Sequence, residues 1–166
     1  MKTTLMGIIL GAAMAASAVA QGYSQPVREM EKEARSAVRG ACEISIEAGH
    51  SGNSVNCAMA DFTQNFGETV PAGKILVIED IAATCYKSNA DLTASLLLRT
   101  GNFWKPLPLQ LVRTLSNGRQ IWISSQQTRL YAKAGENVWA SVDASSNVTQ
   151  STNCGVRFQG HLVTQQ

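Results

Sequence analysis

The sequence predicts an all-β fold, an antiparallel β-sandwich or barrel, with one N-terminal helix and two disulfide bonds. Three observations indicate it: apolar and polar residues alternate after Gly40, turn residues separate the alternating segments, and four cysteines follow a leader typical of export. Alternation with a period of two places each apolar set on one side of a sheet. Eight or nine short segments of this kind are typical of a sandwich or a barrel.

Residues 1–20 have the three-part pattern of a secretory signal peptide. Lys2 gives a positive start, an apolar run covers Leu5–Ala16, and Ala18-Val19-Ala20 is an A-x-A cleavage site. A membrane anchor is the alternative, but this run is shorter than the roughly 20 residues that a spanning helix needs. We therefore expect a secreted or periplasmic protein, with no membrane span after cleavage.

The charge balance argues against two classes of partner. The chain has 14 Lys and Arg against 12 Asp and Glu, and the basic residues form no stripe. A nucleic-acid-binding protein would show a basic patch, and a protein bound to a membrane surface would show a polybasic segment. We expect neither partner.

A helix or arm is predicted within residues 21–40, before the strand pattern begins. Pro26–Arg39 starts with the residue that suits the first helical position. Glu29 lies in its first turn and Arg35 in its last, which complements the helix dipole. Gly40 would end this helix, and residues 41–166 would form the β-sandwich domain.

The first strands are predicted to form a hairpin that one disulfide closes. Ile44 and Ile46 alternate with polar residues before a Gly- and Asn-rich turn. A two-residue loop at Gly49-His50 puts Cys42 opposite Cys57, close to disulfide reach.

The other two cysteines, Cys85 and Cys154, are left to join distant segments, since thiols pair in an oxidising compartment. Zinc is the alternative for four cysteines, but the chain has no C-x-x-C pair and only two histidines. Structural zinc sites use tight ligand pairs. We expect no metal and no cofactor.

The remaining chain is divided into further strands by turn residues. Their expected bounds are Lys74–Tyr86, Leu92–Thr100, Leu107–Leu115, Gln120–Ser125, Thr128–Ala132, Asn137–Asp143 and Cys154–Val163. The apolar faces that we expect in the core are Leu92/Ala94/Leu96/Leu98, Leu107/Leu109/Leu111, Val138/Ala140/Val142 and Val156/Phe158/Gly160/Leu162.

The segment Ile75–Ile78 is apolar on both faces, which predicts a strand covered on both sides. Glu79 and Asp80 follow it. Strict alternation would point them to opposite faces, so they make a poor acid–base pair. We expect Glu79 either at the rim or paired with a cation such as Arg99 or Arg113, because a buried unpaired carboxylate is too costly.

Several phrases resemble a group of small exported bacterial proteins without an assigned activity. They are "VPAGK-ILVIE", "RLYAKAGENVWASV" and the closing "GHLV", between Val70 and Val163. The resemblance implies a jelly-roll β-sandwich and offers no catalytic residues. The helix, the Cys42–Cys57 hairpin and the pair Cys85/Cys154 depart from the group.

The sequence has no complete catalytic motif. His50 lies in a predicted turn, and His161 is expected on the surface, since it alternates with Gly160 and Leu162. Neither has a G-x-S-x-G elbow beside it. Two carboxylates for glycoside hydrolysis would need a separation of about 5–9.5 Å; Glu79, Asp91, Glu136 and Asp143 are the candidates.

The aromatic residues are the candidate ligand-binding residues. Trp104 follows Phe103 in a connection, and Trp122 and Trp139 lie opposite the faces assigned to the core. Each indole could stack on a sugar ring or fill a second apolar face. Buried aromatic residues dominate cores, so we expect Trp122 and Trp139 in a core, whereas Trp104 suits either role.

These observations predict an exported, non-enzymatic binding module at the cell surface or in the periplasm. The expected ligand is a glycan, bound through Trp104 and nearby loops; a surface protein is a further possible partner. Two alternatives stay open: a hydrolase acting on polysaccharide, and a structural or assembly subunit that uses the Pro26–Arg39 helix as its contact. The oligomeric state stays open as well.

Overall fold

Strands account for all the regular structure that the computed structural model describes, which covers residues 36–61, 64–87 and 94–165. These residues belong to one compact unit, Ala34–Gln166. The strands of the described part are β1 (Ser36–Ile46), β2 (Gly52–Asn56), β3 (Ala58–Ala60), β4 (Asn65–Gly67), β5 (Lys74–Lys87), β6 (Ala94–Thr100), β7 (Phe103–Pro106), β8 (Gln110–Thr114), β9 (Gln120–Lys133), β10 (Val138–Ala144) and β11 (Thr152–Thr164).

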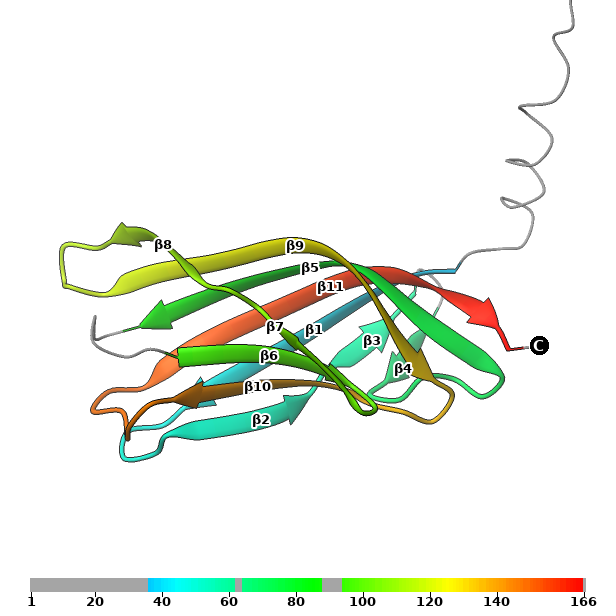
Figure 1. Cartoon of the computed structure of the whole chain (residues 1–166), viewed down its shortest axis with the longest axis horizontal. Coiled ribbons are helices and arrows are strands. Elements are labelled where there is room, and N and C mark those ends of the chain that lie inside the picture. Colours follow the sequence, from blue (N-terminus) through cyan, green and yellow to red (C-terminus); the bar gives the residue numbers. More distant parts are fainter. Residues whose placement is uncertain (1–35, 62–63, 88–93, 166) are drawn as a thin grey trace, which may run out of the picture. The chain divides into compact units, whose positions relative to one another are not determined.

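The strands form two antiparallel sheets (Figure 1). The seven-stranded sheet has the order β4-β3-β1-β11-β5-β9-β8, and the four-stranded sheet has the order β2-β10-β6-β7. The all-β, antiparallel prediction is therefore confirmed. The chain passes repeatedly from one sheet to the other, so strands that follow each other in sequence often lie in different sheets.

Residues from both sheets form one hydrophobic core cluster. Most of the residues expected in the core at β6, β10 and β11 are buried, with Leu98, Val138, Ala140, Val142 and Val156 all at 0% exposure. Gly160 is partly buried, and Leu92 lies outside the described residues. Because every second side chain of these strands leaves water, the apolar pattern fixes which face of each strand points inward.

The predicted helix is wrong where the structure describes it. Residues 21–35 lie outside the described ranges, but Ser36–Ile46 is strand β1, paired along its whole length with β11 from Ser36↔Leu162 to Ile46↔Thr152. Val38 continues the buried alternation of β1 at 1% exposure. This long pairing outweighs the local helix pattern, since propensity is a weak prior against tertiary context.

Gly40 is therefore not a helix end. It lies inside β1 opposite Phe158, whose ring would collide with any added Cβ atom. Phe158 is one of the largest fully buried side chains. The glycine makes room for that ring in the core.

Two other predicted boundaries are also wrong. The expected strand Leu107–Leu115 is shorter in the structure: only Gln110–Thr114 is a strand, β8 of the seven-stranded sheet, and Leu107 and Pro108 lie in the link from β7 of the four-stranded sheet. Leu107 is buried, but Leu111 is 47% exposed. Proline lacks the N–H that a ladder needs, so this is a suitable place for the chain to change sheets. Conversely, the two segments expected at Gln120–Ser125 and Thr128–Ala132 form one strand, β9.

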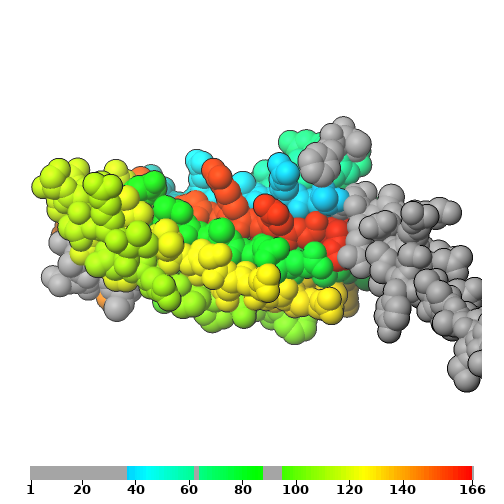
Figure 2. Space-filling view, turned by 90° about the horizontal axis from the view of Figure 1, so that it is seen from above, coloured from blue at the N-terminus to red at the C-terminus, as the bar shows by residue number. Residues whose placement is uncertain are grey.

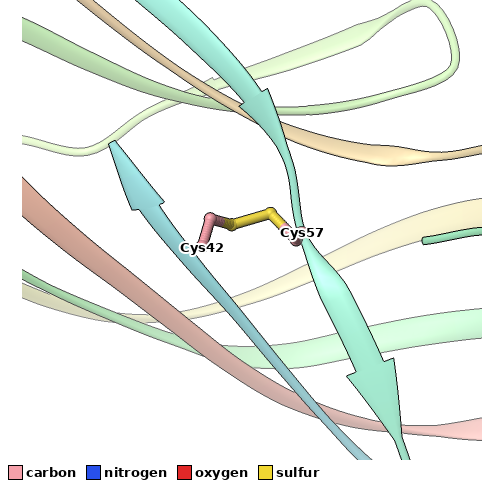
Figure 3. The surroundings of a disulfide bond; sticks show 2 residues. All are labelled: Cys42 and Cys57. Carbon is pink, nitrogen blue, oxygen red and sulfur yellow. A yellow bond between two sulfur atoms is a disulfide. The ribbon is translucent and has the colours of Figure 1, made fainter. Parts of the chain in front are cut away.

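Both predicted disulfides are present. Cys85 and Cys154 are directly opposite on β5 and β11. Cys42 and Cys57 also bond, with Cα atoms 4.4 Å apart (Figure 3). Their predicted register holds at β3, where Ala41 pairs with Ala58.

The simple hairpin behind that prediction is wrong, because β2 pairs with β10 in the other sheet. Cys57 lies between β2 and β3, where the chain returns to the seven-stranded sheet. Its backbone N–H donates to the carbonyl oxygen of Val138 at 2.8 Å.

Two disulfides are typical of proteins in a non-reducing, extracellular type of environment. Within residues 36–61, 64–87 and 94–165, no helix has the length and apolar character to cross a membrane.

Candidate functional site

Two tryptophans and an arginine lie side by side on the outer face of the four-stranded sheet. The register places Asn56 opposite Trp139, Trp139 opposite Arg99, and Arg99 opposite Trp104. Directly opposite residues of neighbouring strands point to the same side, with Cβ atoms about 4.5–5.5 Å apart. We call these four residues the tryptophan row; it crosses β2, β10, β6 and β7, which are labelled in Figure 1.

The indole rings of the tryptophan row are open to solvent. Trp104 is 52% exposed and Trp139 is 41% exposed. Trp139 lies between two buried neighbours of the opposite face, Val138 and Ala140. The two tryptophans are two strand spacings apart, which is about 10 Å between their backbones.

Arg99 is held between the two tryptophan strands. Its Nε donates to the carbonyl oxygen of Gly101 at 2.8 Å, and its guanidinium carbon lies 4.6 Å from the centroid of the Trp104 ring. A cation at this distance is attracted to the indole face. These two contacts fix the plane of the guanidinium, which leaves its terminal N–H groups as oriented donors.

Polar groups adjoin the row at both ends of β2 and β10. Asn56 donates from Nδ2 to Glu68 Oε2 at 2.6 Å, while its buried Oδ1 has no hydrogen-bond partner among the described residues. Two positions along β10, Ser141 donates from Oγ to Asp143 Oδ2 at 3.1 Å. This face therefore combines two apolar ring faces with amide, hydroxyl, carboxylate and guanidinium groups.

The structure brings together only two of the four aromatic residues selected from the sequence. Trp104 and Trp139 share the tryptophan row, so the expected burial of Trp139 in a core is wrong. Phe103 is 68% exposed and alternates to the other side of β7. Trp122 lies on β9 in the other sheet, partly buried against the core.

Trp122 contacts side chains of its own sheet. Its Nε1 donates to Gln120 Oε1 at 3.0 Å, and Lys87 Nζ lies 4.4 Å from its ring centroid. Lys87 is 3% exposed, and burial lowers the pKa of its ammonium group. Trp122, Gln120 and Lys87 belong to the seven-stranded sheet, so they are not part of the tryptophan row.

Sequence reasoning missed Arg99 and Asn56 as functional candidates. Both alternate outward from buried residues, which is the one signal that the sequence carries for them. Their position beside the tryptophans depends on strand order, and alternation says nothing about which strands are neighbours.

The carboxylates considered for hydrolysis are placed as follows. Asp91 lies outside the described residues. Glu136 Oε2 accepts from the Lys133 backbone N–H at 2.7 Å, and Asp143 accepts from Ser141. No group of three or more His, Cys, Asp or Glu side chains that could hold a metal ion occurs in the described ranges.

Glu79 pairs with a residue that we did not expect. Its Oε2 lies 3.3 Å from His161 Nδ1, so neither Arg99 nor Arg113 is its partner. The His161 side chain is only 12% exposed, so its predicted surface position is wrong.

A β-bulge lies at Glu79. The register of β5 shifts between Ile78 and Asp80 against β9, and against β11 it shifts between Gln159 and Gly160. Ile78 and Ile81, three positions apart, are consequently both buried. Strict alternation, on which the opposite-face prediction for Glu79 and Asp80 depended, is interrupted at this point.

A comparison of the chain with models of protein families and with curated proteins finds no match.

Proposed function

We propose that the chain is an exported, non-enzymatic module that binds a glycan through the tryptophan row. The observation that carries the proposal is the register Trp139↔Arg99↔Trp104, which sets two exposed indoles on either side of an oriented guanidinium. Aromatic side chains present a large apolar face. The C–H face of a sugar ring is complementary to such a surface, and its hydroxyl groups suit the donors and acceptors beside it.

The rigidity of this face supports the proposal. The row lies on four hydrogen-bonded strands, and the two central ones, β10 and β6, bury their other face in the core, so the side chains start from fixed backbone positions. A preformed site loses less freedom on binding than a flexible one, which favours affinity.

We further propose that the two sheets form a jelly-roll β-sandwich. The strand orders β1-β11-β5-β9 and β2-β10-β6-β7 support this architecture. They give two four-stranded sheets between which the chain alternates, with the first and last strands adjacent, as in two Greek keys. The strands β3, β4 and β8 would then be additions to the edges of the larger sheet.

The leader at residues 1–20 and the two disulfides support export. Cystines persist in the periplasm and outside the cell, whereas cytosolic thiols are kept reduced. A glycan of the cell surface or its surroundings would be accessible there.

A glycan array with the mature protein tests the function. We expect retention of at least one class of neutral oligosaccharide, and loss of that retention in Trp104→Ala and Trp139→Ala. Tyr131→Ala is the matched control, because Tyr131 is an aromatic residue of β9, in the other sheet, with 49% exposure. Retention that survives both tryptophan substitutions, or that is lost equally in the tyrosine control, contradicts the proposal. Circular dichroism confirms that each variant is folded.

A further inference from the structure

A second surface, unrelated to the tryptophan row, has the form of a ligand site. It lies on the outer face of the seven-stranded sheet, where β9, β5, β11 and β1 run as neighbouring stripes (Figure 2). Two hollows meet there and share Arg157 as a lining residue. We call them together the arginine groove.

The groove exists because its floor consists of small residues. Gly155 has no atom within 4 Å of the place where a Cβ atom would be. Across the neighbouring strands, Ala41 and Ala82 lie opposite Arg157, and Thr84 lies opposite Gly155. The larger hollow has a volume of ≈ 940 Å³, at the upper end of the about 300–1,000 Å³ typical of ligand sites.

The walls of the groove are predominantly cationic. Three arginines line the two hollows, Arg39, Arg119 and Arg157, against one acidic residue, Glu43. The side chain of Arg157 is exposed and makes no hydrogen bond or ion pair with the described part of the chain. Asp80 lies opposite Gln159 on the same sheet and lines neither hollow.

The spacing of these cations suits an extended ligand. Arg39 pairs with Gln159, two positions from Arg157, so the two arginines are diagonal neighbours about 7–8 Å apart at the backbone. In the other direction, Arg119 lies 4.9 Å above the Tyr86 ring. Tyr86 is opposite Asn153, four positions along β11 from Arg157, which is about 13 Å of strand.

We propose that the arginine groove binds an acidic polysaccharide, with Arg157 pairing to a carboxylate at its centre. Guanidinium groups bind carboxylates through oriented, charge-assisted hydrogen bonds. Ser45, Thr84 and Asn153 supply neutral hydrogen-bonding groups between the arginines. That alternation matches a chain of sugars in which hydroxyl groups separate the acidic groups.

Two other anionic polymers fit less well. An acidic peptide binds sheets most readily by adding a strand at an edge, but β1, β11 and β5 are all interior strands. Single-stranded nucleic acid needs aromatic platforms on which its bases stack. Among the described residues that line the larger hollow, Tyr86 is the single aromatic one, which is too few to stack successive bases, and Arg119 occupies one face of its ring.

Isothermal titration of the mature protein with oligogalacturonate tests this site, with the fully methyl-esterified oligomer as the neutral counterpart. We expect binding to the acidic form only, weakened by added salt because exposed charges are screened. Arg157→Gln should weaken binding about tenfold, as expected for loss of a charged hydrogen bond. Arg129→Gln, which removes an exposed arginine that lines neither hollow, should leave it unchanged.

Four results would overturn this inference: no binding of the acidic oligomer, equal binding of the esterified form, native affinity in Arg157→Gln, or equal binding of polyglutamate. Trp104→Ala separates the two sites. It should keep native affinity for oligogalacturonate even if the glycan array fails, and a loss as large as that of Arg157→Gln would assign the acidic probe to the tryptophan row instead.

Discussion

Cys85 and Cys154 occupy directly opposite positions on β5 and β11, with Cα atoms 4.1 Å apart, although they are 69 positions apart in the sequence. They therefore connect two central strands of the seven-stranded sheet, and both are buried. The other disulfide, Cys42–Cys57, spans only 15 residues.

Removal of the long-range disulfide should cost more stability than removal of the short-range one. Loop closure predicts a loss of about 4 kcal/mol for Cys85→Ala/Cys154→Ala and about 3 kcal/mol for Cys42→Ala/Cys57→Ala. Urea unfolding of the two double variants measures both losses. A larger loss in the second variant would show that chain entropy does not set the order.

Two glycines of β11 should respond in opposite ways to a single methyl group. A Cβ atom at Gly160 would collide with the Val77 carbonyl oxygen, whereas Gly155 has open space. Gly160→Ala should lower the free energy of unfolding by about 3 kcal/mol, as overpacking does. Gly155→Ala should change it by less than about 1 kcal/mol. Equal effects in thermal unfolding would contradict the close approach of β5 and β11 at the bulge.

Lys87 should make stability depend on pH in the alkaline range. Burial lowers its pKa in the folded chain below the usual 10.5. Between the two pKa values the unfolded chain binds more protons, so the free energy of unfolding rises with pH across that window. Below the window both states are protonated and the cost of burying the charge applies in full.

Denaturant unfolding of the native chain and of Lys87→Met, followed upward from neutral pH, measures this contribution. The native chain should gain stability relative to the variant as pH rises toward 10.5. Lys133→Met is the control, because Lys133 is exposed at the end of β9. Parallel curves for the native chain and Lys87→Met would refute the prediction.

Arg99→Lys should weaken glycan binding about tenfold although the positive charge is kept. Lysine lacks the planar fork of donors and stacks less well on an indole. The hydrogen bond to Gly101 and the contact with Trp104 would both be altered. Titration with the best oligosaccharide from the array measures the change, and unchanged affinity would exclude the guanidinium from the site.

The all-β fold class and the two disulfide pairs could be predicted from the sequence. The fold class depends on a local pattern within each strand, and the disulfide pairs depend on a choice among few alternatives. Alternation identifies strands such as β10 directly, and four cysteines leave few pairings. The register of Cys42 and Cys57 was right for β1 and β3, although the intervening β2 belongs to the other sheet.

The errors arise where long-range pairing overrides local preference. The local pattern predicts that residues 36–39 end a helix. In the structure they pair with β11 instead, because that strand extends to Leu162 and beyond. The bulge at Glu79 has no marker in β5 itself; it depends on the close approach of Gly160 from the neighbouring strand.

In the candidate site, too, local patterns indicate less than long-range strand pairing does. Trp139 is exposed because its neighbours on β10, Val138 and Ala140, point into the hydrophobic core. The neighbourhood of Trp104, Arg99 and Trp139 required the order β10-β6-β7, which no periodicity encodes.

Cys57 also links the redox state of the surroundings to the ligand face. Asn56, the first residue of the tryptophan row, is bonded in sequence to this half-cystine, whose amide is anchored to Val138 beside Trp139. Oxidation thus tethers one end of the row to β1 in the opposite sheet. A thiol-reducing environment would remove that tether, so we expect the end of the row at Asn56 to be less firmly held before the disulfide forms.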